Sequence, residues 1–183
     1  SIISHKTGIV NLRLQPPASK SISNRLLLMS ALSENKMIIE NLSDSDDTRV
    51  IINALASDEK EKDIGHAGTA MRFLTAYYAL MPGEVILTGS ERMKNRPVGE
   101  LTEILCKLGA NIEYIEKDGY PPIKIKGGNL KSRDIEINSS ISSQYISALL
   151  MIAPMLEKGL KIKLKGKTTS ASYINLTIEL MKK

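Results

Sequence analysis

The chain has 183 residues, 42% of them hydrophobic, so it can bury a core of its own, which argues against disorder. Its 25 basic and 20 acidic residues leave a net charge of +5, which favours anionic ligands but is too evenly mixed for a nucleic-acid-binding stripe. No apolar run reaches the roughly 20 residues of a membrane helix, and no signal-peptide pattern opens the sequence, so we expect a cytoplasmic protein with no membrane contact.

Aromatic residues, cysteine and histidine are scarce, which excludes several kinds of site. Trp is absent and Phe occurs once, so the stacking surfaces of single-strand binders are thinly supplied, and we expect no nucleic-acid partner. His5 and His66 are too separated for a recognisable zinc motif, and one cysteine forms no internal disulfide. We therefore expect no metal and no cofactor. Cys106 lies among apolar residues at helical spacing and is predicted to be buried.

Three stretches of the chain resemble one another and organise its predicted elements. Each begins with small or polar residues and continues as an apolar helix, a short β-branched strand, a polar loop and a second helix. The helix, strand and helix are predicted over residues 19–32, 36–40 and 43–55 in the first copy, 67–80, 84–88 and 91–105 in the second, and 141–153, 160–164 and 168–181 in the third. The alignment pairs Ser21 with Thr69 and Ser143.

A β-hairpin is predicted between the second and third copies. Ile112–Ile115 and Ile123–Lys126 alternate as strands do, and Lys117–Pro122 between them is rich in turn residues. A strand over residues 134–137 precedes the third copy, whereas residues 56–65 are too few for an equivalent hairpin after the first. The sequence thus predicts a mixed α+β fold of three homologous units around shared helices, the first without its hairpin and the third ending after its second helix.

Polar or small residues stand at the predicted starts of all the repeated helices. The first helices begin at Lys20-Ser21, Gly68-Thr69 and Ser142-Ser143, and the second at Asp47-Thr48, Asn95-Arg96 and Thr169-Ser170. Ser and Thr are helix caps in any protein, and capping alone would explain each of them. If the three units share a symmetry axis, however, the helix starts gather at one pole of the molecule.

Helix starts gathered in this way would form an anion-binding site. Each helix N-terminus presents unpaired N–H groups and a partial positive charge, which stabilise phosphate or carboxylate. Gly68 would let a ligand approach the backbone closely, and Lys20 adds a compact charge. Arg25 and Arg96 can each grip an anion through two parallel hydrogen bonds. The hydroxyl groups of three serines would complete the site, namely Ser142, Ser143 and Ser170.

Other polar residues have two interpretations each. Arg72 either reaches the same pole or is a structural or solvated arginine, and His66 either donates to an anion or caps its loop. Acidic residues at a helix start usually serve its dipole, which applies to Asp44, Asp46 and Asp47. Alternating lysines on a strand indicate one solvated face, which applies to Lys161, Lys163 and Lys165.

Six motifs in order along the chain resemble those of the enolpyruvyl transferase family, in particular its branch that acts on shikimate 3-phosphate. The motifs are Ser19-Lys-Ser-Ile-Ser-Asn-Arg25, Asp44-Ser-Asp-Asp47, Ala67-Gly-Thr-Ala-Met-Arg72, Arg92-Met-Lys-Asn-Arg-Pro97, Ser142-Ser-Gln144 and Ser170-Ala-Ser-Tyr-Ile174. The resemblance implies a globe of three βαβαββ units, one of two that enclose a substrate cleft. Residues 15–183 would be this globe, incomplete at its C-terminal end, and residues 1–14 a first strand that joins the other globe.

The resemblance also implies substrates and their ligands. Shikimate 3-phosphate would be held by Lys20, Ser21, Arg25, Ser142, Ser143, Gln144 and Ser170, with Tyr173 nearby. Phosphoenolpyruvate would be held by Lys20, Gly68, Arg96 and Gln144. His66 stands where the family commonly has Asn and is not counted as a ligand, and Phe73 replaces a common Pro, which could shift the start of its helix.

The implied reaction transfers the enolpyruvyl group to the 5-hydroxyl of shikimate 3-phosphate and releases phosphate. In the family, the acid and base come from the other half of a longer, monomeric chain, so we expect this chain alone to bind without turnover. Two alternatives stay open, a non-catalytic anion-binding module and the branch that acts on UDP-N-acetylglucosamine. That branch has Lys-Asn in place of Lys20-Ser21 and a reactive loop cysteine, whereas Cys106 is predicted on a helix.

Overall fold

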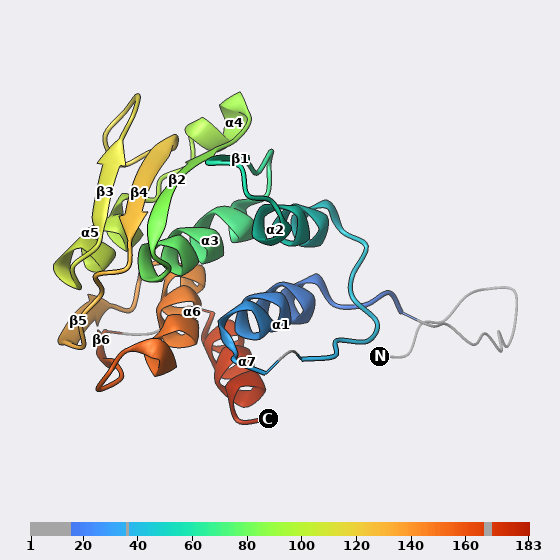
Figure 1. Ribbon diagram of the computed structural model, residues 1–183. Coiled ribbons are helices and arrows are strands. Elements are labelled where there is room, and N and C mark those ends of the chain that lie inside the picture. Colours follow the sequence, from blue (N-terminus) through green and yellow to red (C-terminus); the bar gives the residue numbers. More distant parts are fainter. Residues whose placement is uncertain (1–15, 36, 167–169) are drawn as a thin grey trace, which may run out of the picture.

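The computed structural model describes residues 16–35, 37–166 and 170–183 (Figure 1). The helices are α1 Lys20–Leu32, α2 Asp46–Ala56, α3 Gly68–Leu80, α4 Glu91–Lys94, α5 Gly99–Lys107, α6 Ser143–Ile152, the short 3₁₀ helix η1 Ala153–Met155, and α7 Ala171–Met181. The strands are β1 Glu61–Asp63, β2 Gly83–Thr88, β3 Asn111–Tyr114, β4 Ile123–Gly127, β5 Asp134–Asn138 and β6 Lys161–Lys165. The strand predicted near residues 2–10 lies outside the described residues.

Two sheets flank the helices. One has the strand order β1-β2-β4-β3, in which β1 is parallel to β2 and β4 is antiparallel to both its neighbours. The other consists of the parallel pair β5 and β6. In β5 the isoleucines are buried and the acidic residues exposed, the alternation expected where one face of a sheet covers a core. The predicted hairpin is confirmed as β3 and β4, and the fold is of the mixed α+β class.

The core lies around α3. Nine of its thirteen residues are buried, because apolar or small side chains occur all around it. It packs against α1, α2 and α6 as well as β4, and α6 in turn packs against α7 (Figure 1). Phe73, which stands where the family commonly has Pro, is fully buried in α3. This replacement does not shift the start of the helix, because α3 begins at Gly68 as predicted from the repeat.

Three predictions about local structure are wrong. Residues 37–40 form no strand, since no strand among the described residues pairs with them, and the Ile38 side chain is 92% exposed. The second helix of copy two is divided into α4 and α5, because Pro97 has no N–H and disfavours helical backbone at Arg96. Cys106 is exposed rather than buried. The preceding Leu105 faces the core, and the next position on a helix is rotated by about 100°, which turns Cys106 away from the core.

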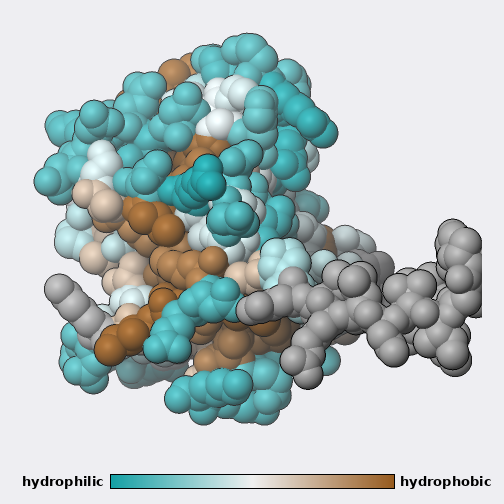
Figure 2. Space-filling model, turned by 90° about the vertical axis from the view of Figure 1, so that its right-hand side faces the viewer, coloured by the Kyte–Doolittle hydropathy of each residue, from teal (hydrophilic) through white to brown (hydrophobic). Residues whose placement is uncertain are grey.

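Figure 2 shows the side of the molecule that lies to the right in Figure 1. A band of apolar residues crosses the middle of this face, between hydrophilic surfaces above and below it. Among the described residues, no helix combines the length and the apolar character that crossing a membrane requires.

Candidate anion-binding site

The starts of α1, α3 and α6 and the first turn of α7 meet around one cavity of about 380 Å³. Its walls are largely polar and carry three basic side chains. The lining residues are Lys20, Ser21, Arg25, Thr69, Arg96, Ser142, Ser143, Gln144 and Tyr173. The helix starts therefore do gather at one pole, and three helix dipoles add to the positive charge of this cavity.

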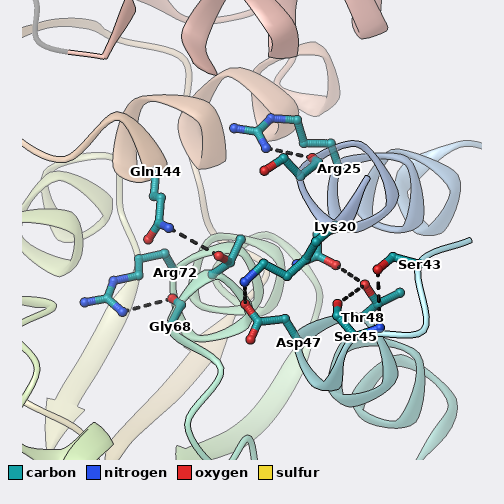
Figure 3. Close-up of polar contacts among 12 residues, drawn as sticks. Lys20, Arg25, Ser43, Ser45, Asp47, Thr48, Gly68, Arg72 and Gln144 are labelled. Atoms are coloured by element: carbon teal, nitrogen blue, oxygen red, sulfur yellow. Dashed lines mark hydrogen bonds and ion pairs between the residues drawn. The ribbon is translucent and has the colours of Figure 1, made fainter. Parts of the chain in front are cut away.

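Lys20, the first residue of α1, lies at the rim of the cavity. Its Nζ is 3.2 Å from Asp47 Oδ1 at the start of α2, and the Lys20 side chain is half exposed (Figure 3). The preceding Ser19 caps α1 through its Oγ, which accepts from the N–H of Ile22 at 3.4 Å. The Asp47 side chain is 18% exposed, so an anionic ligand would compete with a partly buried carboxylate for the half-exposed ammonium of Lys20.

Arg25 is held from several sides by the protein itself. Its Nε donates to Thr177 Oγ1 at 2.7 Å, and its Nη1 donates to the carbonyl of Ser21 at 2.8 Å. Its Nη2 donates to Ser147 Oγ at 3.2 Å and to the carbonyl of Tyr173 at 3.4 Å. Four of the five N–H groups of the guanidinium are thus engaged, which leaves one for a ligand. The parallel two-bond grip predicted for Arg25 is therefore not available without breaking one of these bonds.

Two aromatic rings enclose the Arg25 guanidinium. Its Cζ lies 5.4 Å from the centre of the Phe73 ring and 5.9 Å from that of Tyr173, within the range of cation–π attraction. Burial lowers the pKa of Arg25, and the nearby Tyr173 acts in the opposite direction. An arginine so placed keeps its charge at neutral pH, because its ordinary pKa is far above 7. It gives the cavity a fixed positive wall.

Arg96 presents its guanidinium to the cavity from the turn between α4 and α5. It lies directly over Gly68, where an added Cβ would stand 2.6 Å from Arg96 Cζ. Within the part of the chain that the structure describes, the Arg96 guanidinium has no hydrogen-bond acceptor, in contrast to that of Arg25. Gly68 itself does not line the cavity; its missing side chain makes room for Arg96. Arg96 is thus the arginine that can offer two parallel hydrogen bonds to an anion.

The start of α6 supplies hydroxyl and amide groups to the cavity. Ser142 caps the helix, since its Oγ accepts from the N–H of Gln144 at 3.3 Å. The Gln144 side chain crosses to α3, where its Nε2 donates to Thr69 Oγ1 at 3.2 Å (Figure 3). Ser143 lines the cavity beside them. These groups provide neutral donors between the cationic side chains.

Besides Gly68, two further residues considered in the sequence, Ser170 and His66, lie outside the cavity lining. Ser170 stands just before α7 with φ of 57° and an exposed side chain, and the preceding residues 167–169 are outside the described part of the chain. His66 is exposed, and its Nδ1 is 2.6 Å from Ser90 Oγ, which is the loop-capping role rather than a contact with the cavity.

The three strand lysines 161, 163 and 165 are solvated, as predicted, and pair with acidic residues of β5.

Arg72 is structural in this molecule. It is 5% exposed, and its guanidinium donates to the carbonyls of Gly68 at 2.9 Å and Pro97 at 3.0 Å. Burial lowers the pKa of Arg72; Tyr145 opposes this and the charge of Arg96 adds to it.

Sequence reasoning did not identify the residues that hold Arg25. Thr177 and Ser147 are fully buried, and Thr177 Oγ1 lies 2.9 Å from Ser147 Oγ. Both hydroxyl groups lie on apolar helix faces, and a hydroxyl in such a place is the only signal that the sequence offers. Their partner Arg25 is 152 residues from Thr177 and 122 residues from Ser147 along the chain. Thr69 was recognised only as a helix start; the repeat alignment with Ser21 and Ser143 is the signal that points to it.

The described residues, 16–35, 37–166 and 170–183, contain no group of three or more His, Cys, Asp or Glu side chains that could hold a metal ion. The chemistry available at the cavity is that of binding and orienting anions. Basic side chains and helix starts supply the charge, and serine and glutamine side chains supply neutral hydrogen bonds.

Comparison with known proteins gives consistent matches along the chain. The model of a protein family described as EPSP synthase (3-phosphoshikimate 1-carboxyvinyltransferase) matches residues 5–57 and 52–183. The 3-phosphoshikimate 1-carboxyvinyltransferase of Bacteroides fragilis strain YCH46 is 52% identical over 169 residues, which are 92% of this chain and 41% of that protein. The protein of the same name from Salmonella paratyphi B is 42% identical over 206 residues, which are 98% of this chain and 47% of that protein.

A solved structure shares the fold. The EPSP synthase from Acinetobacter baumannii superimposes with a TM-score of 0.80 at 19% sequence identity, over 92% of this chain and 42% of that chain. The present chain thus spans less than half the length of the curated relatives that it matches.

Proposed function

Because this chain belongs to the EPSP synthase (3-phosphoshikimate 1-carboxyvinyltransferase) family, we propose that it supplies the anion-binding half of such an enzyme. The observation that carries the proposal is the cavity between the helix starts, into which Lys20, Arg25 and Arg96 converge. Both substrates implied by the family, shikimate 3-phosphate and phosphoenolpyruvate, carry a phosphate and a carboxylate. A cavity with three basic groups and several hydroxyl groups suits such ligands.

The family resemblance divides the residues between the two substrates, with Lys20 and Gln144 assigned to both. The proposed ligands of shikimate 3-phosphate are Lys20, Ser21, Arg25, Ser142, Ser143, Gln144 and Ser170; all but Ser170 line the cavity. Those of phosphoenolpyruvate are Lys20, Gly68, Arg96 and Gln144; Gly68, which does not line the cavity, would contribute by leaving space for the Arg96 guanidinium. The Arg96 guanidinium, with its unengaged N–H groups, suits a two-bond grip on the phosphoenolpyruvate, whereas Arg25 contributes one N–H and a fixed charge.

In the proposed reaction, the 5-hydroxyl oxygen of shikimate 3-phosphate bonds to C2 of phosphoenolpyruvate while C3 accepts a proton. The resulting intermediate then loses phosphate from C2 and a proton from C3, which leaves the enolpyruvyl ether. Residues of this chain would hold both substrates and offset their negative charges, so that hydroxyl and C2 meet despite electrostatic repulsion. The proton-transferring groups would come from the rest of a longer, monomeric, cytoplasmic enzyme of aromatic amino acid biosynthesis.

Thermal unfolding with ligands tests the binding proposal. We expect shikimate 3-phosphate to raise the melting temperature of this chain, and shikimate, which lacks the phosphate, to raise it less. Ser143→Ala should reduce the shift, while Ser140→Ala, an exposed serine outside the cavity lining, should not. Equal shifts in both variants would show that the ligand binds elsewhere.

Turnover tests the division of labour. With both substrates present, release of phosphate from phosphoenolpyruvate by this chain should stay at background. Sustained release by the pure chain would contradict the assignment of acid and base to the remainder of the enzyme.

A further inference from the structure

The carbonyl oxygen of Pro97 accepts hydrogen bonds from two buried side chains on different helices. Arg72 Nη2 of α3 donates to it at 3.0 Å, and Tyr145 Oη of α6 donates at 2.8 Å. The two side chains are 5% and 4% exposed, and the Arg72 Cζ lies 6.0 Å from the centre of the Tyr145 ring. Pro97 directly follows Arg96, so these bonds act on the turn from which Arg96 enters the cavity.

The same two residues are tied to the other helix starts of the cavity. The Nη1 of Arg72 donates to the carbonyl of Gly68 at 2.9 Å (Figure 3), and because its Nη2 donates to Pro97, one guanidinium bridges the start of α3 and the turn. Tyr145 directly follows Gln144 in the first turn of α6. The hydroxyl of Tyr145 therefore fixes the spacing between Gln144 and Arg96, two of the proposed phosphoenolpyruvate ligands.

The far flank of the turn is anchored as well. The N–H groups of Val98 and Gly99 both donate to the carbonyl of Gly119 in the loop between β3 and β4, at 2.9 and 3.1 Å. The N–H of Arg96 donates to the carbonyl of Met93 at 2.9 Å. The other side of the turn is held through the Pro97 carbonyl by Arg72 and Tyr145, so loss of these two hydrogen bonds would release that side.

We propose that Arg72 and Tyr145 are positioning residues that hold the Arg96 guanidinium over Gly68 by jointly binding the Pro97 carbonyl. Neither residue lines the cavity, and the Tyr145 hydroxyl and two N–H groups of Arg72 are bonded to backbone oxygens, so they act on a ligand in the cavity through Arg96. The charges of Arg72 and Arg96 also lie close enough to repel each other. We call the two hydrogen bonds from Arg72 and Tyr145 to the Pro97 carbonyl the clamp. The binding of an anion by Arg96 rests on the proposed function, whereas the clamp does not.

Three variants separate the clamp from general stability. Tyr145→Phe removes one hydroxyl, and Arg72→Lys keeps the charge but cannot bridge two carbonyls. Tyr78→Phe is the matched control, because the Tyr78 hydroxyl also donates to a carbonyl, that of Ala54 at 2.7 Å, away from the cavity.

Amide hydrogen exchange in the absence of ligand tests the clamp. We expect the N–H groups of Arg96 and Val98 to exchange about fivefold faster in Tyr145→Phe and Arg72→Lys, and at the wild-type rate in Tyr78→Phe. Amides within α3 and α5 should keep their rates. Uniform acceleration of all amides would overturn the proposal, because the two residues would then stabilise the fold as a whole. No acceleration at the turn would overturn it as well, because the two residues would then not hold the turn.

Titration with inorganic phosphate, followed at the Arg96 Nε–H resonance, tests whether the clamp affects anion binding by Arg96. The apparent Kd of phosphate should rise about fivefold in Tyr145→Phe and stay within twofold in Tyr78→Phe. Equal affinities in the two variants would refute the positioning role. If phosphate moves no resonance of Arg96 or Lys20 in the wild-type chain, the proposed function fails instead, and the exchange rates alone decide the clamp.

Discussion

At the scale of single residues, Gly68 matters for the space it leaves rather than for a contact it makes. The guanidinium of Arg96 occupies the position that a side chain of residue 68 would take. The atoms that would collide belong to the mobile end of an arginine, so they can move aside without disturbing the backbone. Any side chain at this position is therefore expected to alter the cavity more than the fold.

Gly68→Ala should separate binding from stability. The added methyl group displaces the Arg96 guanidinium, so we expect affinity for inorganic phosphate or phosphoenolpyruvate to fall about tenfold, comparable to the loss of one charge-assisted hydrogen bond. Stability should change by less than about 1 kcal/mol, since alanine suits a helix better than glycine. Calorimetric titration and urea unfolding measure the two effects. A strongly destabilised variant would show that Arg96 cannot move as described.

Asp47 competes with anionic ligands for Lys20, and Asp47→Asn should show it. Removing the carboxylate is expected to raise phosphate affinity about two- to threefold at low salt, with under about 1 kcal/mol change in stability. Asp46→Asn, in the same first turn of α2, is the control for the helix dipole. The gain should shrink as ionic strength rises, and an equal gain in both variants would argue for a general charge effect.

At the scale of elements, a buried polar network joins α1, α6 and α7. Arg25 of α1 donates to Thr177 of α7 and to Ser147 of α6, and the two hydroxyl groups bond to each other. Since an unpaired polar group in a core is costly, each helix depends on the other two for its hydrogen bonds. The network lies beneath the cavity and sets the distance between the starts of these helices.

Replacing Thr177 tests this network. Thr177→Val keeps the shape but leaves Arg25 Nε and Ser147 Oγ without their partner, and should lower the unfolding free energy by roughly 1–3 kcal/mol. Thr177→Ser retains the hydroxyl and should be the more stable of the two variants in urea unfolding. If valine were equally well tolerated, the hydrogen bonds would be unimportant relative to packing.

At the scale of the whole molecule, the helices provide both the core and the site. α3 packs against α1, α2 and α6 and against the sheet that contains β4, and its first turn contributes Thr69 to the cavity (Figure 1). Tyrosines mark the places where helices meet other elements. Tyr78 and Tyr145 each bond to a distant carbonyl, and Tyr77 packs edge to face on Tyr78 with 5.1 Å between ring centres.

These tyrosines predict a loss of stability at alkaline pH. Burial raises the pKa of Tyr78 from 10.0 to about 12, with Tyr77 adding to the effect, and burial also raises the pKa values of Tyr77 and Tyr145. The unfolded chain loses these protons near pH 10 while the folded chain retains them, so stability falls as pH rises from about 10 toward 12. Urea unfolding between pH 8 and 11.5 measures the slope. Tyr78→Phe should flatten it, and an unchanged slope would argue against Tyr78 as a source.

The sequence by itself determined the class of fold, the hairpin and the helix starts that carry the site. Periodicity predicted α1, α3 and α6 at their observed starts, because capping residues and apolar spacing are local properties. Local signals of the same kind identified Lys20, Ser21, Arg25, Arg96, Ser142 and Ser143, and the family resemblance added Gln144; all of these residues line the cavity.

Only the tertiary structure decided what each of these residues is free to do. Arg25 and Arg96 look alike in the sequence, yet Arg25 has three N–H groups engaged by residues of α6 and α7 and a fourth by its own helix, whereas Arg96 lies over a glycine and has no side-chain acceptor among the described residues. Arg72 and Tyr145 acquire their role through one shared carbonyl, that of Pro97. Hydrogen-bond partners so far apart along the chain leave no local pattern, because they are brought together by packing of the core, which also left Cys106 on the outer face of α5.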